Sequence, residues 1–334
     1  MLKITGNYFL GIFLYTLVII LLADFGRILL KYVFHASWIH SRTAFTVTGA
    51  ICALLILLLS ACGIFHAKYI KTTSYDVIIN KTIPERTSMK VVLLADTHFG
   101  YNAGVLHARE LVRKINKQKP DLVCIAGDIF DNEYDAIRNP EKLEKTLRGI
   151  KSTYGVYACW GNHDLNEEIL AGFTFKHKDG DLSDIKDPRM KKFLEDSNIH
   201  ILEDESVLIN DQFYVIGRKD ASLTEKIHET KKAPAQLTEK LDRDKPIIMI
   251  DHQPKELQEL ADAGVDLDLC GHTHNGQTFP GNFTIKLMWE NPCGLLSKDN
   301  MTNITTSGAG VWGPAMRIGT DSEICSINIQ LKKA

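Results

Sequence analysis

Side chains that bind metal ions occur in five short clusters, and each cluster directly follows a run of apolar, strand-like residues. Loops at the carboxyl ends of the strands in an open α/β sheet converge on one crevice, so residues far apart in the sequence can meet there. The pattern therefore predicts one metal site. The clusters are Asp96-Thr97-His98, Gly127-Asp128, Gly161-Asn162-His163-Asp164, Asp251-His252 and Gly271-His272-Thr273-His274.

The clusters contain the ligand types of a site for two metal ions. Two divalent ions about 3.5–4 Å apart can hold the attacking and leaving oxygens of a phosphoryl group and lower the pKa of a water between them. Mixed carboxylate and imidazole ligands suit Mn, Fe or Zn, whereas an all-oxygen set would favour Mg or Ca. We therefore expect two divalent metal ions, with Mn as the first candidate. The candidate ligands are Asp96, His98, Asp128, Asn162, His252, His272 and His274.

No cluster is specific by itself. Asp-x-His and Gly-Asp occur by chance in many chains, and a lone histidine after a strand usually has a structural role. The pair His272 and His274 is more specific, because side chains two apart in an extended segment point the same way. All five clusters together, each after a strand, indicate a functional site.

The segments between the strand-like runs have helical spacing. Apolar residues recur at this spacing over residues 111–115, 143–150 and 257–261, and Asn139-Pro140 is typical of a helix start. This alternation predicts crossover helices and a largely parallel sheet. Short strand-like segments then predict an added antiparallel region, at residues 199–202, 207–209, 213–216 and 324–329.

We expect an α/β fold with two sheets, an α/β/β/α sandwich, preceded by two transmembrane helices. Because the clusters must share one core, residues 72–334 are expected to form a single domain. The polar stretch 165–188, with Phe173 and Phe175, is interpreted either as a lid over the site or as an ordinary surface loop.

The order of the motifs resembles that of the calcineurin-like metallophosphoesterases. Their pattern of Asp-x-His, Gly-Asp-x-x-Asp, Gly-Asn-His-Asp, His and Gly-His-x-His covers this chain from about Lys90 to His274. The resemblance implies the calcineurin-like phosphoesterase fold and attack on phosphorus by a hydroxide that bridges two metal ions. It assigns Asp96, His98, Asp128 and His274 to one ion, and Asp128, Asn162, His252 and His272 to the other, with Asp128 bridging.

The same resemblance implies a catalytic role for His163, which would not bind metal. It would act on the leaving oxygen as a general acid or stabilise the transition state, as an imidazole can near neutral pH. The resemblance points to Asp131 as the carboxylate that orients His163. Asp164 is the alternative, but neighbouring side chains on a turn rarely face each other, so for Asp164 we expect a local turn contact.

The segments around Asn275 and from Ser307 to Pro314 resemble a membrane-associated bacterial branch of the family. That branch includes cell-wall-associated phosphoesterases and a UDP-2,3-diacylglucosamine pyrophosphohydrolase. The run Gly308–Gly313 also fits Gly-x-Gly-x-x-Gly, but it leads into a proline rather than a helix, so no dinucleotide cofactor is expected. Trp312 or Arg317, in or just after this run, is a candidate for substrate contact, and plain packing is the alternative for Trp312.

Two apolar segments, at about 8–30 and 44–65, are each long enough to cross a membrane. Asp24 and Arg27 interrupt the first segment, but they are three apart and can pair on a helix. We expect residues 1–71 to be an uncleaved anchor with two transmembrane helices and a basic stem. A cleaved signal peptide is the alternative, but no small-x-small site follows the first segment. A lipobox-like sequence at Cys62 leaves lipidation open.

We expect an integral protein of a bacterial inner membrane. Two spans place both ends of the chain on one side, but the basic residues that flank the spans are balanced and do not indicate which side. The oligomeric state is left open.

The composition excludes several other classes. A hydrophobic content of 45% over 334 residues supports a substantial core. A net charge of -2 gives no basic field for a nucleic acid, so no nucleic-acid partner is expected. Seven cysteines without a Cys-x-x-Cys pair indicate neither a zinc knuckle nor a disulfide framework.

These features predict a membrane-anchored, metal-dependent phosphoric ester hydrolase that cleaves a phosphoester or pyrophosphate bond. A lipid-linked molecule is one substrate that they allow, and the choice among monoester, diester and pyrophosphate is left open. One alternative is a cyclic-nucleotide or other soluble phosphodiesterase. The other is a membrane-tethered binding protein that has lost catalysis, although no ligand or acid is missing here.

Overall fold

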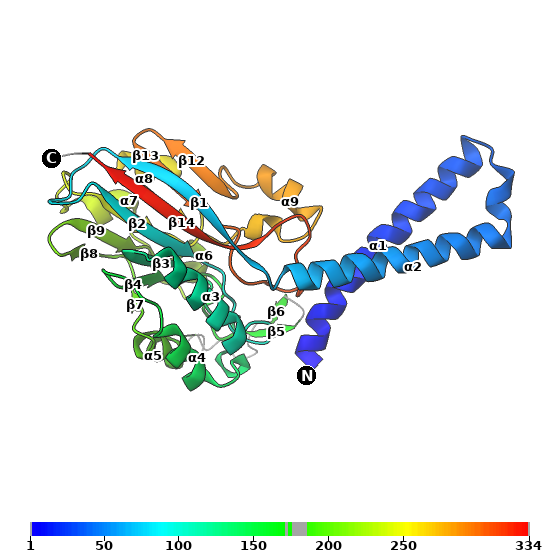
Figure 1. Ribbon diagram of the computed structural model, residues 1–334, viewed down its shortest axis with the longest axis horizontal. Coiled ribbons are helices and arrows are strands. Elements are labelled where there is room, and N and C mark those ends of the chain that lie inside the picture. Colours follow the sequence, from blue (N-terminus) through cyan, green and yellow to red (C-terminus); the bar gives the residue numbers. More distant parts are fainter. Residues whose placement is uncertain (1, 171–172, 176–185, 333–334) are drawn as a thin grey trace.

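The computed structural model describes residues 2–170, 173–175 and 186–332, and it consists of a helical hairpin attached to a two-sheet domain (Figure 1). Part of the predicted lid, including residues 176–185, lies outside the described residues. Before residues 176–185, β5 (Glu168–Leu170) and β6 (Phe173–Phe175) form a small antiparallel pair.

The first sheet has six strands in the order β1-β14-β2-β3-β4-β7. All neighbouring pairs are parallel except β14 and β2. The strands are β1 (Ile70–Ile79), β2 (Ser88–Leu94), β3 (Leu122–Ala126), β4 (Val156–Cys159), β7 (His200–Ile201) and β14 (Ser322–Leu331).

The second sheet has the order β12-β13-β11-β10-β9-β8, with parallel pairing in its centre and antiparallel pairing at both edges. Its strands are β8 (Glu205–Ile209), β9 (Phe213–Gly217), β10 (Ile247–Ile250), β11 (Leu267–Cys270), β12 (Gly294–Lys298) and β13 (Met301–Thr305).

Helices cover the outer face of each sheet, and apolar residues fill three layers. Leu93 and Ile250 belong to the core between the sheets. Leu111 and Phe193 belong to the layer between the first sheet and its helices, which are α3 (Val105–Gln118), α4 (Pro140–Leu147) and α5 (Pro188–Asp196). Leu260 belongs to the layer outside the second sheet, where α7 (Pro234–Thr238) and α8 (Leu257–Asp262) lie. The short helix α6 (Ala221–Lys226) follows β9 in the chain. The predicted α/β/β/α sandwich is confirmed.

Two local predictions were only partly correct. Among the late strands, β8 and β9 form the expected antiparallel pair and β14 pairs antiparallel with β2, but β7 pairs in parallel with β4 and β14 lies inside the first sheet rather than in an added region. Asn139 precedes α4, but it has a φ of 58° and makes no side-chain cap; only Pro140, at the first helical position, follows the expectation. The helix predicted over residues 257–261 is α8, and Gly264, with a φ of 84°, follows its end.

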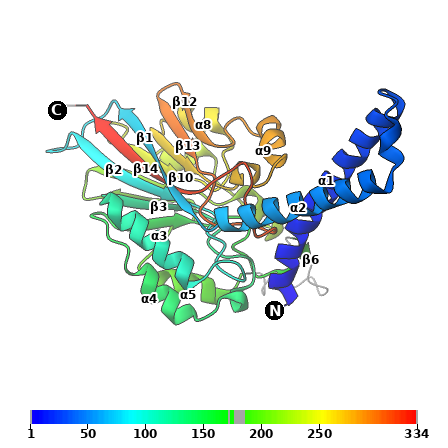
Figure 2. The ribbon, with the colours of Figure 1, turned by 45° about the vertical axis from the view of Figure 1, so that its right-hand side comes forward.

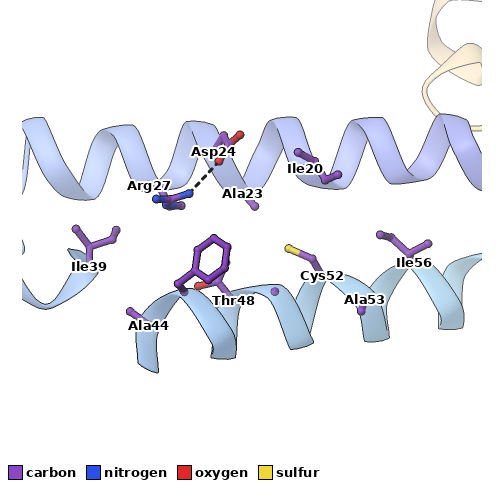
Figure 3. A pocket seen from close by; sticks show the side chains of 12 residues that line it. Ile20, Ala23, Asp24, Arg27, Ile39, Ala44, Thr48, Cys52, Ala53 and Ile56 are labelled. Carbon is purple, nitrogen blue, oxygen red and sulfur yellow. Dashed lines mark hydrogen bonds and ion pairs between the residues drawn. The ribbon is translucent and has the colours of Figure 1, made fainter. Parts of the chain in front are cut away.

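The hairpin consists of α1 (Leu2–Tyr32) and α2 (Arg42–His66), joined by the short 3-10 helix η1 (Ser37–His40). Both helices are long and apolar enough to cross a membrane. Nη1 of Arg27 lies 3.4 Å from Oδ1 of Asp24, as expected, beside a space of about 400 Å³ between the helices (Figure 3). This space is open along the hairpin rather than part of the metal site.

The first half of α1 packs against the domain instead of standing free. The hydroxyl of Tyr15 donates to the carbonyl of Phe279 at 2.9 Å, and Nδ2 of Asn7 donates to Oδ1 of Asn102 at 3.2 Å. Beyond this half, Leu21 and Leu22 are exposed. The end of α2 is tied to the domain as well, since the amide of Arg317 donates to the carbonyl of Gly63. A domain boundary near residue 71 stays a prediction.

Candidate metal centre

The candidate ligands stand on loops that leave the carboxyl ends of β2, β3, β4, β10 and β11, so strands from both sheets contribute to one site. Most of these loop residues have a left-handed backbone, which costs free energy outside glycine and is typical of functional loops. The ligands with positive φ are Asp96 (53°), His98 (44°), Asp128 (50°), His272 (72°) and His274 (48°).

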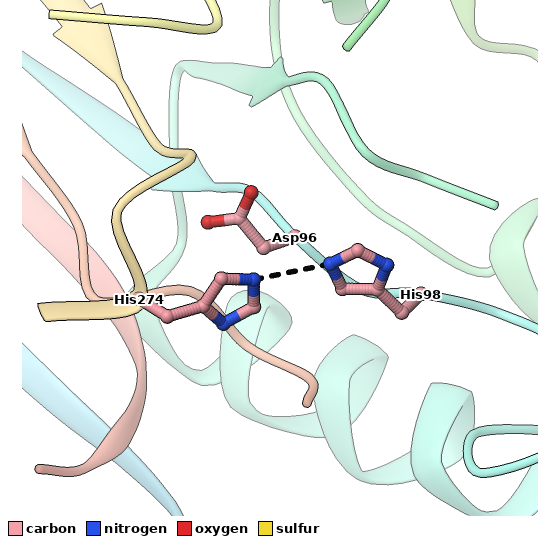
Figure 4. A group of neighbouring side chains, drawn as sticks. All are labelled: Asp96, His98 and His274. Atoms are coloured by element: carbon pink, nitrogen blue, oxygen red, sulfur yellow. Dashed lines mark hydrogen bonds between the residues drawn. The ribbon is translucent and has the colours of Figure 1, made fainter. Parts of the chain in front are cut away.

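Two groups of three side chains each bring their donor atoms together. Asp96, His98 and His274 form the first group and are all buried (Figure 4). The donor atoms within each group lie within 4.8 Å of one another. The second group is Asp128, His252 and His272.

Asp128 lies between the two groups. Its Oδ2 is 3.2 Å from Nε2 of His252 and 3.9 Å from Nε2 of His98. Asn162 joins the second group, because its Oδ1 lies 3.0 Å from the same Nε2 of His252. The structure therefore brings together all seven residues that the sequence suggested as ligands.

The spacing of the ring nitrogens fits metal coordination. Nε2 of His98 and Nε2 of His274 are 3.1 Å apart, and Nδ1 of His272 is 3.2 Å from Nε2 of His252. Bonds of about 2.0–2.2 Å to a shared ion would hold two such nitrogens about 3.0–3.5 Å apart. The other nitrogen of His252, Nδ1, lies 2.8 Å from the carbonyl oxygen of Ala126. This contact requires the proton on Nδ1 and leaves Nε2 free to bind a cation.

Glycine is needed where the loops approach each other. A Cβ on Gly161 would lie 2.2 Å from Oδ1 of Asp128, so any side chain at residue 161 would displace this carboxylate. This explains why the motif with Asn162 and His163 begins with glycine.

His163 lies at the edge of the ligand group, and the hydrogen bond of its Nδ1 is with Asn132 rather than with Asp131. Its Nδ1 is 2.6 Å from Oδ1 of Asn132, whereas Oδ1 of Asp131 lies 3.6 Å from Nδ1 of His98. Neither Oδ1 of Asp131 nor Nδ1 of His98 has a hydrogen-bond partner in the described part of the chain. The orienting role of Asp131 toward His163 stays a prediction, and Asn132 makes the contact seen here.

Asn132 was missed because an asparagine after the Gly-Asp-x-x-Asp motif carries no distinctive signal. Its position next to Asp131 was the available clue. Asp164 has the expected local role, because its two carboxylate oxygens accept hydrogen bonds from the amides of Phe130 and Gly161, at 2.8 and 2.7 Å.

Burial controls the protonation of the site. It raises the pKa of Asp96 to about 6 and lowers the pKa of His163 to about 4. It also lowers the pKa of His272 to about 3, which favours the neutral imidazole that binds metals.

Arg317 does not contact substrate space, in contrast to the sequence-based suggestion. Its side chain is fully buried, and its Nη2 lies 2.8 Å from the carbonyl oxygen of Gly310 and 3.1 Å from Nδ1 of His274. The guanidinium therefore joins the late loop to the ligand loop. Trp312 lines the pocket, with its ring centre 5.6 Å from that of His163.

A cavity of about 560 Å³ opens over the ligands. Asp128, His163, His272 and His274 form its polar floor. Its apolar walls come from α1, from the segment after the last candidate ligand and from the late loop that carries Trp312. They consist of Leu10, Leu14, Ile285, Met288, Trp289 and Trp312. The first helix of the hairpin is thus a wall of the candidate active site.

These features define a phosphoesterase-type metal centre, and the chain belongs to the calcineurin-like phosphoesterase family, whose family model matches residues 89–276. The chain is 32% identical to an uncharacterized metallophosphoesterase of Campylobacter jejuni, over 74% of this chain and 61% of that protein. It is 30% identical to a transmembrane protein with metallophosphoesterase domain of Danio rerio, over 79% and 58%.

A third relative is the UDP-2,3-diacylglucosamine pyrophosphatase LpxG of Chlamydia trachomatis. The identity is 23%, over 74% of this chain and 86% of that protein. The chain spans only about three fifths of the length of the Campylobacter and Danio relatives.

Proposed function

We propose that this protein is a membrane-anchored phosphohydrolase that uses two divalent ions, Mn first among them, to cleave a phosphoester or pyrophosphate bond in an acylated molecule. The observation that carries the proposal is the cavity, which joins the ligand group directly to Leu10 and Leu14 of the anchor helix. A phosphate would lie on the floor, and an apolar group would lie against the walls.

In this proposal Asp96, His98, Asp128 and His274 hold one ion. Asp128, Asn162, His252 and His272 hold the second, with Asp128 shared. Two bound ions would supply Lewis-acid stabilisation of the phosphoryl oxygens and a nucleophilic water at neutral pH. The protein itself positions the ligands through strained loops and excludes bulk water with apolar walls.

His163 would protonate the leaving oxygen. Because its Nδ1 lies against Oδ1 of Asn132, that nitrogen carries a proton, and the transferred proton must come from Nε2 of a charged ring. An anionic phosphate in the pocket favours this charge, which burial alone disfavours. Asn132 would hold the ring in a fixed orientation.

The substrate class is argued from the apolar walls and from one relative. The relative's name describes a pyrophosphatase acting on a diacylated sugar nucleotide, and a molecule of that kind combines a charged phosphate with acyl chains. The cavity suits such a molecule, because its polar floor could hold the phosphate and its apolar walls could contact the acyl chains. The membrane would be the inner membrane of a bacterium, crossed by α1 and α2.

The test uses the purified full chain in detergent or nanodiscs, after metal analysis and supply of Mn. The wild type and His163→Ala are assayed on bis(p-nitrophenyl) phosphate, a soluble nucleotide and an acylated pyrophosphate. We expect hydrolysis that needs metal and His163, with kcat/KM highest for the acylated compound. Equal values for the soluble nucleotide would overturn the substrate class, and no hydrolysis of any compound would favour an inactive binding protein.

A further inference from the structure

The segment from Phe279 to Trp289 exposes more large apolar side chains than any other described loop of the domain. It contains α9 (Gly281–Thr284) and the 3-10 helix η5 (Ile285–Leu287). Four of its side chains are exposed, namely Phe279, Phe283 (61%), Leu287 (88%) and Met288 (74%). Water contact on this scale is unfavourable, so a contiguous apolar patch of this kind indicates a binding surface.

The position of this segment identifies what covers it. It lies on the side of the domain from which the hairpin leaves, in both ribbon views (Figure 2). The carbonyl of Phe279 accepts from the hydroxyl of Tyr15 in α1, and its amide donates to the carbonyl of Ile318 at 2.8 Å. Ile318 in turn lies against Gly63 of α2. The segment is therefore held beside both apolar helices.

The charges of the segment suit a lipid headgroup layer. Lys286 is exposed within η5, and Nζ of Lys255 lies 5.2 Å from the centre of the Trp289 ring. The neighbouring acid, Glu290, is already paired with Lys298. Aromatic and basic side chains around exposed aliphatic ones are typical of segments that lie in a membrane interface.

We propose that residues 279–288 insert into the leaflet that borders the domain, in the same bilayer that holds α1 and α2. Phe283 and Leu287 would enter the acyl region, while Lys286 would remain at the headgroups. The same segment also lines the cavity, through Ile285, Met288 and Trp289. A molecule with acyl chains could then pass from the leaflet to the metal centre without crossing water. The insertion itself does not depend on the proposed hydrolysis; only this route does.

The insertion is tested by site-directed nitroxide labelling in nanodiscs of phosphatidylethanolamine and phosphatidylglycerol. The background replaces the three cysteines that are not buried, Cys52, Cys62 and Cys293. Labels at Phe283→Cys and Leu287→Cys are compared with a label at Ile78→Cys, an exposed aliphatic site (68%) near the far end of β1. Accessibility to oxygen and to a water-soluble nickel chelate is measured for each label by its relaxation.

We expect the Phe283 and Leu287 labels to be accessible to oxygen and at least fivefold less accessible to the nickel chelate than the Ile78 label. Equal chelate accessibility at all three sites would overturn the insertion.

The route to the site is tested with the double variant Phe283→Ser/Leu287→Ser, since neither side chain lines the cavity. We expect its rate on an acylated pyrophosphate in vesicles to fall at least tenfold and its rate on bis(p-nitrophenyl) phosphate to remain unchanged. Equal losses on both substrates would contradict the route. If the wild type hydrolyses neither substrate, the proposed function fails, while the label depths still decide the insertion.

Discussion

The two sides of the cavity are built by different means. The floor consists of polar side chains fixed on strained loops at the ends of five strands, and most of these side chains are buried. The walls consist of apolar side chains on α1 and on an exposed surface segment. The floor is what phosphoesters of every kind require. We therefore expect mutations of the floor to reduce hydrolysis of every substrate, and mutations of the walls to reduce hydrolysis only of substrates with an apolar group. Mutations on each side test this separation.

The largest effect is expected from the shared carboxylate of the floor. Asp128→Asn removes the negative charge between the two ligand groups, so we expect both metal affinity and kcat/KM to fall, the latter by on the order of 10³-fold on every substrate. Metal content by mass spectrometry and rates on soluble and acylated compounds measure this. Retained metal stoichiometry with full activity would show that Asp128 is not a shared ligand.

A smaller effect is expected from the orientation of the acid. Asn132→Leu removes the acceptor at Nδ1 of His163, and we expect kcat to fall about 10–100-fold on all substrates with little change in KM or metal content. Asn132→Asp keeps an acceptor and should retain most of the activity. If Asp131→Asn gives the large loss and Asn132→Leu gives none, the orienting carboxylate is Asp131 after all.

The walls should affect only substrates with an apolar group. Leu14→Ser removes apolar contact worth about 1.5 kcal/mol, so we expect kcat/KM for an acylated compound to fall about tenfold and that for bis(p-nitrophenyl) phosphate to stay the same. Leu21→Ser on the exposed half of α1 is the matched control and should leave both rates unchanged. Equal losses for the two compounds at Leu14 would break the separation of floor and walls.

The smallest effect is expected at the foot of α1, where Lys3 pairs with Glu133, the residue after Asn132. The pair is partly exposed, so Lys3→Met should change the free energy of unfolding by less than about 1 kcal/mol and every rate by less than threefold. Thermal melts and the same two assays measure this. A tenfold loss on the soluble compound would mean that α1 helps to position the acid, and the two sides would then be coupled.

The polar floor could be predicted from sequence, because each ligand follows an apolar strand in a fixed order. The prediction of Asp96 and His98 depends only on the rule that loops at the carboxyl ends of the strands converge. The contact of His163 with Asn132 could not be predicted, since it depends on how two loops cross rather than on spacing. The role of α1 was also out of reach, because Leu14 beside the cavity and Leu21 on the open helix face have the same hydropathy.

The place of β14 in the first sheet has a consequence for biogenesis. β14 pairs with β1 on one side and with β2 on the other, yet every other strand of both sheets precedes it in the chain. During synthesis the hairpin, β1 and β2 all emerge before β14, so the sheet has an open slot between β1 and β2 until residues 322–331 are made. The loop that carries Arg317, whose amide donates to the carbonyl of Gly63, directly precedes β14 in the chain. A chain stopped before residue 322 would therefore keep the hairpin and its contacts with the domain but would leave the slot between β1 and β2 unfilled.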